Sequence, residues 1–421
     1  MRTRIEVLNR QAGSILMMTL FSAMLIGVVL AGYLTLVQHQ EVAVTRSQGW
    51  NAALTLAEAG VEEALAQMNS GDLSANGWGP PSGANFNLQS RALAGGRYDV
   101  RYDTNTSSSP TIVSIGYVNL PSSSATLSRQ VKVSTKAVPL INVAVAAKYG
   151  ITVNDASGIT ADSFNSAESA HSDNGRYPLG QATKLLANGD VASVNGPVNL
   201  GSPTIKGDLY MGPVAAGGSG VTASQVSGKI YTDFNADYPD MTAPAGALWW
   251  TPAMTTNGIH EFNNGGTYTV NDSKDITVRF GSGLNGIKVT LYVMATATNF
   301  HPTIEIENSG PKSSSLTIYQ VAGTASLSVR VDSQRAEDFV YYGLPGVTSV
   351  TYDKPGADFF GVIYAPSANL MLNSGWSGKH FVGACVARSI TMNAHYNFHY
   401  DENLLKTGPM RGYVAKSWEE L

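Results

Sequence analysis

The sequence predicts a mainly β protein that begins with one long helix. Glycine accounts for 43 of the 421 residues, against an average share of ~7%. Only 14% of the residues are charged, whereas ~25% is usual. Short apolar runs separated by Asn, Gly, Ser and Asp fill most of the chain beyond residue 140, a pattern typical of many short strands joined by turns. The chain also exceeds one ordinary domain in length, so at least two folded parts are expected.

Composition and cysteine content exclude several classes of function. The 27 basic and 31 acidic residues give a net charge of -4. The chain therefore has no basic excess for a phosphate backbone, and nucleic acid is not an expected partner. Cys385 is the single cysteine, which excludes an intrachain disulfide, a zinc ribbon and a CxxC redox pair. We expect neither a cofactor nor a bound metal.

In chain order, the first element is a membrane-spanning helix over residues 15–37. These residues carry no charge, and as a helix they span ~34 Å, enough for a hydrocarbon core of ~30 Å. A cleaved secretory signal is the alternative, but its apolar region has only ~7 to 15 residues. Arg2, Arg4 and Arg10 precede the span, so residues 1–13 are expected to form a basic cytoplasmic leader while the remaining chain is exported.

Small residues recur at every fourth position within the span. They are Thr19, Ala23, Gly27, Ala31 and Thr35. Small side chains let a second membrane helix approach closely, so this spacing predicts packing against another helix. The alternative is that the spacing reflects only the general abundance of small residues in membrane helices.

The helical pattern continues beyond the bilayer. No proline occurs before Pro80, and the helix is expected to cover residues 14–70 and to stop at Asn69-Ser70-Gly71. Its second half carries an apolar stripe, which needs a folded surface to cover it. The residues of the stripe are Leu54, Ala57, Val61, Ala64, Leu65 and Met68.

Three strands are expected to supply that surface. The segments 97–103, 111–118 and 125–136 alternate polar and apolar residues and are separated by turn-forming residues. They predict a small three-stranded antiparallel neck over residues 88–139, with the helix packed on one face.

Residues 140–405 are expected to form a large β head, followed by a C-terminal tail over residues 406–421. Two-residue hairpin signals are scarce between the apolar runs, which favours parallel coils. We therefore expect a right-handed parallel β-helix, with a two-sheet β-sandwich as the alternative. The runs lie at 205–211, 276–280, 289–293, 304–306, 316–319, 327–331, 359–364, 370–372 and 381–386.

Two N-terminal segments carry a family resemblance. The segment QAGSILMMTLFSAMLIGVVLAGYL, followed by LAEAGVEEAL, resembles the N-terminal part of PilX-type pilus-assembly proteins, relatives of type IV pilins and type II secretion pseudopilins. The resemblance covers roughly residues 10–136. It implies a prepilin peptidase cut between Gly13 and Ser14, an exposed continuation of the helix at residues 57–60, and a pilin-like α+β neck.

The same resemblance implies partners and a location. Other pilins or pilus-assembly proteins, membrane lipid and prepilin peptidase are the implied partners. The chain would cross a bacterial inner membrane once, with its N-terminus in the cytoplasm and its bulk in the periplasm or in a surface filament.

One position departs from the family pattern. Pilins usually carry a glutamate at the fifth position after the cut, and here that position is Met18. Two expectations therefore stand side by side. A processed chain enters a filament, whereas an unprocessed chain stays in the membrane as a permanent anchor.

The head carries a second resemblance. Residues 159–177 and 359–404 resemble the β-helical C-terminal domain often attached to PilX-type N-termini, and residues 188–212 are similar to the coils of bactofilins. This implies the same β-helical head that the apolar runs predict.

Histidines near the C-terminus invite a metal interpretation. His395 and His399, with Asp401 close by, alternate with aromatic residues as on a strand. On a strand the two histidine side chains lie ~13 Å apart, too far for one ion. The alternation instead indicates that these polar residues face outward while the aromatic residues between them face inward.

Paired acids were considered as catalytic groups. Glu305 and Glu307 share one strand face at ~7 Å, which suits an inverting glycosidase, although a solvated strand edge is far more common. The other close acids in the head are Asp233 with Asp237 and Asp240, and Glu337 with Asp338.

Aromatic pairs and the single cysteine have structural interpretations. Trp249-Trp250 and Tyr341-Tyr342 could stack on sugars, but filling of the core is favoured. Cys385 lies in an apolar run and is expected to be a small buried residue.

The sequence as a whole predicts a structural, membrane-anchored component or assembly factor of a type IV pilus or a type II secretion-like pseudopilus, and not an enzyme. The alternative is a membrane-tethered β-helical protein that binds or cleaves carbohydrate.

Overall fold

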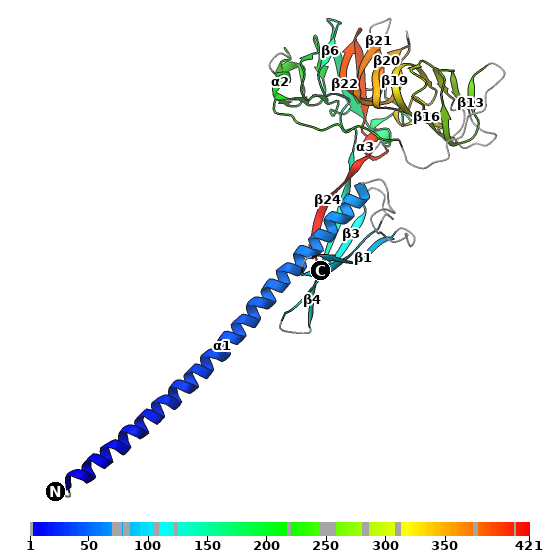
Figure 1. The fold of residues 1–421 in the computed structure, drawn as a ribbon. Helices are drawn as coiled ribbons and strands as arrows, with labels where there is room; N and C mark the ends of the chain where they lie inside the picture. The colour runs from blue at the N-terminus through cyan, green and yellow to red at the C-terminus, as the bar shows by residue number, and fades with distance from the viewer. Residues whose placement is uncertain are drawn as a thin grey trace. The chain divides into compact units, whose positions relative to one another are not determined.

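The computed structural model divides into two compact units (Figure 1). Unit 1 contains Met1–Val138 and Gly412–Leu421, and unit 2 contains Pro139–Arg411. The chain is mainly β with one long apolar N-terminal helix, which confirms the predicted class at this level. The structure describes residues 3–69, 78, 85–93, 95–103, 109–121, 125–216, 220–243, 258–279, 286–307, 313–354, 356–373, 378–407 and 410–421.

Unit 1 begins with a single helix, α1, over Thr3–Asn69. It starts earlier than the predicted 14–70, because residues 3–12 contain neither proline nor glycine. It ends directly before Ser70-Gly71, as the stop signal predicts.

The second half of α1 packs on strands β2 and β3 of unit 1 through the predicted stripe. Within that stripe, Leu54 and Leu65 are partly buried. The other four members are buried, which confirms the face that the 3.6-residue period indicates. These are Ala57, Val61, Ala64 and Met68.

Five strands form the sheet of unit 1, in the order β1-β2-β3-β4-β24. The pairings β1–β2, β2–β3 and β3–β4 are antiparallel. Strands β2, β3 and β4 confirm the three predicted segments, and β1 and β24 are two strands more than predicted. The bounds are β1 Asn85–Leu93, β2 Gly96–Asp103, β3 Thr111–Asn119, β4 Thr126–Pro139 and β24 Met410–Glu420.

Strand β24 occupies the segment that the sequence analysis expects to be a tail. Most of its side chains are exposed on both faces, so it lacks the polar and apolar alternation of a half-buried strand. Hydrogen bonds from its main chain hold it instead, to β4 and to the end of α1. The N–H of Leu421 donates to the Gln130 carbonyl at 3.0 Å, and the N–H of Tyr413 donates to the Asn69 side-chain oxygen at 2.7 Å.

Two glycines let α1 lie close to this sheet. A Cβ atom at Gly116 would lie 2.7 Å from the backbone nitrogen of Ala57, and even closer to the backbone oxygen of Ala53. A Cβ atom at Gly60 would lie 2.9 Å from the ring of Tyr98. Glycine at both positions therefore sets the distance between helix and sheet.

Unit 2 is mainly β, and the strand pairings described within it are parallel. Val340 lies beside Val362 and Phe359 beside Phe381, so these strands repeat at about 22 residues. The strands are β5 Val145–Ala147, β6 Ile151–Val153, β7 Ile159–Phe164, β8 Val191–Ser193, β9 Val198–Asn199, β10 Thr204–Ile205, β11 Leu209–Met211, β12 Ile230–Tyr231, β13 His260–Phe262, β14 Gly266–Val270, β15 Ile276–Val278, β16 Lys288–Val293, β17 Asn299–Phe300, β18 Thr303–Ile306, β19 Ser315–Val331, β20 Phe339–Asp353, β21 Phe359–Asn373, β22 Lys379–Met392 and β23 Tyr396–Asp401. Two short helices, α2 Pro213–Ala216 and α3 Leu404–Thr407, and four 3-10 turns at Ser169–His171, Ala182–Lys184, Ala223–Gln225 and Ala336–Asp338 complete the unit.

Some of the predicted runs merge into longer strands. Runs 316–319 and 327–331 both lie in β19, and runs 359–364 and 370–372 both lie in β21. Small residues separate the runs, and there the pairing shifts in register while the strand continues. A register shift bends a strand without ending it.

The chain enters the stack of strands in its middle. Strand β22 pairs with β5 and β6, and β23 pairs with β7. On their other side, β5 and β6 pair with β8 and β9. We call the boundary between β22–β23 and β5–β7 the seam. An asparagine ladder crosses it, because Asn154 donates to Asn393 and Asn393 donates to Asn373, each at 2.7 Å.

Aromatic side chains stack inside unit 2. The ring of Phe381 lies 4.4 Å from that of Phe359 and 5.0 Å from that of Phe398, measured between centroids. Tyr341 is fully buried and its hydroxyl donates to Gln320 at 2.7 Å. The Tyr341-Tyr342 pair therefore fills the core, as predicted, and offers no surface for sugars. The pair Trp249-Trp250 lies outside the described residues.

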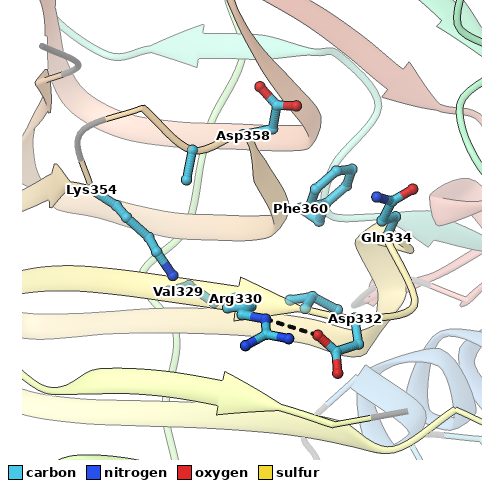
Figure 2. Close-up of a pocket in the computed structure, with 9 residues that line it drawn as sticks. Val329, Arg330, Asp332, Gln334, Lys354, Asp358 and Phe360 are labelled. Atoms are coloured by element: carbon cyan, nitrogen blue, oxygen red, sulfur yellow. Dashed lines mark ion pairs between the residues drawn. The ribbon is translucent and has the colours of Figure 1, made fainter. Parts of the chain in front are cut away.

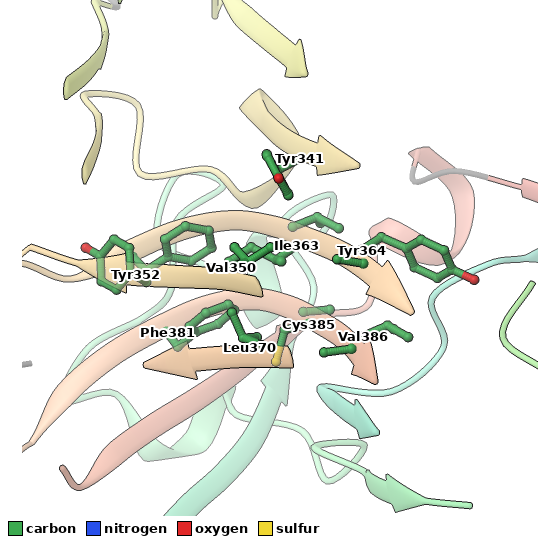
Figure 3. Packing of buried hydrophobic residues seen from close by; sticks show 14 of the residues in the cluster. Tyr341, Val350, Tyr352, Ile363, Tyr364, Leu370, Phe381, Cys385 and Val386 are labelled. Atoms are coloured by element: carbon green, nitrogen blue, oxygen red, sulfur yellow. The ribbon is translucent and has the colours of Figure 1, made fainter. Parts of the chain in front are cut away.

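Cys385 is also part of this core. Its side chain is fully buried (Figure 3), which confirms the prediction. Burial raises the pKa of its thiol, so the group remains a neutral apolar one at physiological pH.

Candidate functional site

The first half of α1 is exposed and strongly apolar. The segment Ser14–Asn69 contains a window apolar enough to cross a membrane, and no part of that window is buried within the chain. Leu16 is 73% exposed and Leu34 is 55% exposed. The exposed apolar surface of the first half is compatible with contacts to lipid or to other apolar helices.

The five small residues of the predicted packing row all lie on this exposed segment. The hydroxyls of Thr19 and Thr35 donate back to the helix carbonyls of Leu16 and Ala31, at 2.9 and 2.7 Å, so they present little polarity to a neighbour. Outside the neighbouring residues of its own helix, no described atom lies within 4 Å of a Cβ built at Gly27. All five members of the row are exposed.

The paired acids take part in ion pairs between neighbouring strands. Glu305 lies 3.7 Å from Arg330, and Glu307 lies 3.2 Å from Arg279. Of the other acids, Asp237 lies 3.3 Å from Arg411, and Asp338 is buried. Burial raises the pKa of Asp338 to about 6. The structure does not bring these acids together around one cavity.

A hydrogen-bonded chain crosses the seam. His399 Nδ1 lies 2.6 Å from Asp162 Oδ1, and His399 Nε2 lies 2.7 Å from Nδ1 of His380. The ring of Tyr177 stacks on His399 at 3.5 Å and its hydroxyl donates to Asp162 at 3.2 Å. The prediction that His399 and Asp401 face solvent is wrong, because both side chains are almost fully buried. Tyr177, in the chain beyond β7, covers His399.

These contacts fit one arrangement of neutral rings. A neutral His399 that donates its Nδ1 proton to Asp162 has Nε2 as an acceptor. In that arrangement His380 donates from its own Nδ1, and its Nε2 carries a lone pair. Burial, followed by the neighbouring His399, lowers the pKa of His380. The His380 ring is therefore neutral at physiological pH.

His380 lines a cavity on the surface of unit 2. A cavity of about 100 Å³ is bordered by His380, Tyr177 and Leu179, and a second of about 300 Å³ by Arg330, Asp332 and Lys354. The two cavities share three residues, which Figure 2 labels, so we treat them together as the seam groove. The shared residues are Gln334, Asp358 and Phe360.

Two details hold the seam groove in shape. Gln334 adopts a left-handed backbone conformation with φ of 58°, which is costly for a residue other than glycine and often marks a functional position. The backbone N–H of His380 donates to Asp358 Oδ1 at 3.0 Å.

Sequence analysis missed this groove, because Asp162 and His399 are 237 positions apart. His380 directly precedes the predicted run 381–386, so that run gave no signal for it.

Comparisons with known proteins give two similarities. A family model described as a domain of unknown function, DUF7305, matches residues 255–407. That segment contains His380 and His399 but not Asp162. A search of curated proteins finds no match. Among solved structures, the chain is similar to the competence-associated pilin ComZ from Thermus thermophilus, with 12% sequence identity, a TM-score of 0.30, and coverage of 88% of this chain and 97% of that chain.

Proposed function

We propose that the protein is a pilin-like structural component or assembly factor of a type IV pilus or a type II secretion-like pseudopilus. The contrast between the two halves of α1 carries this proposal. The first half exposes its apolar side chains, whereas the second half packs on the sheet of unit 1. A helix of this kind can join lipid or other helices at one end while a folded unit holds the other end.

We infer that α1 crosses a bacterial inner membrane once, with the N-terminus in the cytoplasm. The charge bias of Arg2, Arg4 and Arg10 supports this orientation. Both units would then lie in the periplasm or in a surface filament, with lipid and other pilins as the neighbours of the exposed half.

The leader is proposed to be removed between Gly13 and Ser14 by a prepilin peptidase. Both residues lie within α1, so the peptidase must open the first turns of the helix to cut there. Intact-mass measurement of the purified protein distinguishes the two routes. Loss of residues 1–13 supports filament entry. A retained leader supports a permanent membrane anchor, the route left open because Met18 replaces the usual glutamate.

Unit 2 is proposed to be a right-handed parallel β-helix. Parallel pairing at about 22-residue intervals supports it, since a β-sandwich is built from antiparallel strands. A double cysteine variant at Asn369 and Ser389, whose side chains are hydrogen-bonded at 2.7 Å across β21 and β22, should form a disulfide under oxidation. A failure of these cysteines to bridge in a folded protein would contradict this register.

A structural and not a catalytic role is proposed for the chain. Deletion of the gene should reduce surface pili or the process that they drive. A copy carrying Glu305→Gln and Glu307→Gln should restore piliation, because these acids only pair with arginines. If that folded, exported variant fails to complement, or the purified protein cleaves a polysaccharide, the enzymatic alternative is favoured.

A further inference from the structure

The seam groove offers several hydrogen-bond acceptors. His380 Nε2 carries a lone pair by the proton assignment above, and no group in the described part of the chain bonds it. Asp358 uses Oδ1 for the backbone of His380, which leaves its second oxygen for a ligand. Gln334, exposed on its left-handed turn, adds an amide. A ligand rich in O–H donors would satisfy these groups together.

The walls between these acceptors are apolar. Phe360 is partly buried and borders both cavities, and Figure 2 shows its ring between Asp358 and Gln334. Leu179, at 67% exposed, and Tyr177 also line the smaller cavity. A shallow site with aromatic faces and a few placed polar groups suits a ring that has both C–H faces and hydroxyl edges.

Charge argues against an anionic ligand or a bound metal ion. Arg330 is paired with Asp332 at 3.0 Å and with Glu305 at 3.7 Å, so it does not offer an isolated cation. Lys354 has a favourable charge interaction with Glu305, which offsets part of its attraction for an anion. Among the residues that the structure describes, no cluster of three or more His, Cys, Asp or Glu side chains could hold a metal ion.

The geometry points to the seam groove as a binding site for a neutral saccharide, with His380 Nε2 and Asp358 accepting its hydroxyl protons and Phe360 facing its ring. The hydrogen-bonded chain from Asp162 through His399 positions His380 and keeps its proton on Nδ1. This activity stands beside the pilin-like role and does not depend on it, because the site lies wholly within unit 2.

Saturation-transfer NMR on the full chain in lipid nanodiscs, without sugar detergents, tests the site. The probes are methyl glucoside, methyl galactoside, N-acetylglucosamine, cellobiose and chitobiose, with glucuronate as an anionic control. At least one neutral probe should bind at millimolar concentration or tighter. Binding by none of them, or by glucuronate alone, overturns the inference.

Paired variants separate ligand binding from a role in the seam. His380→Asn keeps a donor near His399 but removes Nε2, whereas His380→Gln keeps a polar group near the Nε2 position. The Asn variant should weaken saccharide binding about tenfold, the effect of one lost hydrogen bond, and the Gln variant should weaken it less. Phe360→Leu should also weaken binding, while His301→Gln, at an exposed position outside the groove, should not. Equal affinities across all four variants would contradict the assigned site.

Discussion

Replacing Gly116 with alanine should loosen α1 from the sheet of unit 1. The new Cβ atom would lie 2.7 Å from the backbone nitrogen of Ala57 and 2.9 Å from Cβ of Leu56, where ordinary contact begins at 3.4 Å. Because the nearest atoms belong to helix backbone, no side-chain rotation relieves the clash. Overpacking of this kind costs ~1 to 3 kcal/mol, and we expect the upper end, about 3 kcal/mol.

Gly27→Ala is the matched control on the exposed half of the helix. Outside the neighbouring residues of its own helix, no described atom lies within 4 Å of a Cβ at Gly27, so the substitution should leave the packing of helix on sheet unchanged. Hydrogen exchange followed by mass spectrometry on the full chain in nanodiscs reports each unit separately. Peptides from residues 111–119 should exchange about 100-fold faster in Gly116→Ala, the equivalent of about 3 kcal/mol, and at the wild-type rate in Gly27→Ala. Equal protection in both variants would refute the close packing of helix on sheet.

Three further predictions concern the core, pH and topology. Phe381→Ala should destabilise unit 2 by about 4 kcal/mol in denaturant unfolding, because the Phe381 ring is fully buried between Phe359 and Phe398. A decrease of less than 1 kcal/mol in the free energy of unfolding would contradict the aromatic stack. Burial raises the pKa of Asp338 to about 6, so its contribution to stability is present below pH ~4 and is lost as the pH rises through about 6. Asp338→Asn should remove this loss, which is worth at most about 3 kcal/mol. A variant whose thermal unfolding has the same pH profile as the wild type would contradict this prediction. Alkaline phosphatase fused after the exposed Leu421 should be active, as the exported orientation requires, and an inactive but stably expressed fusion would reverse the topology.

The sequence predicted local elements wherever one face is buried. The stripe from Leu54 to Met68 and strands β2, β3 and β4 have a period that burial imposes, and the structure follows it. Strand β24 was missed because both of its faces are largely exposed. The extra length of α1 before residue 14 arose because nothing in residues 3–12 ends a helix.

The candidate groove depends on contacts that no local pattern contains. Asp162 meets His399 only because the chain enters its stack of strands in the middle and returns to the same place. His399 looked solvent-facing on its strand, and the chain after β7, which buries it, has no periodic pattern. Pairing between distant segments depends on the order of strands in space, and a single sequence does not encode that order in its periodicity.

The claim that the exposed half of α1 meets other pilin-like helices is tested most directly by crosslinking in living cells. A photoreactive residue in place of Leu34, which is 55% exposed and lies between Ala31 and Thr35 of the small-residue row, would report what lies against this face. Protein adducts that contain a second copy of this chain or another pilin-like helix are predicted, and Gly27→Leu should reduce them while membrane insertion persists. Adducts with lipid alone would contradict the pilin-like role.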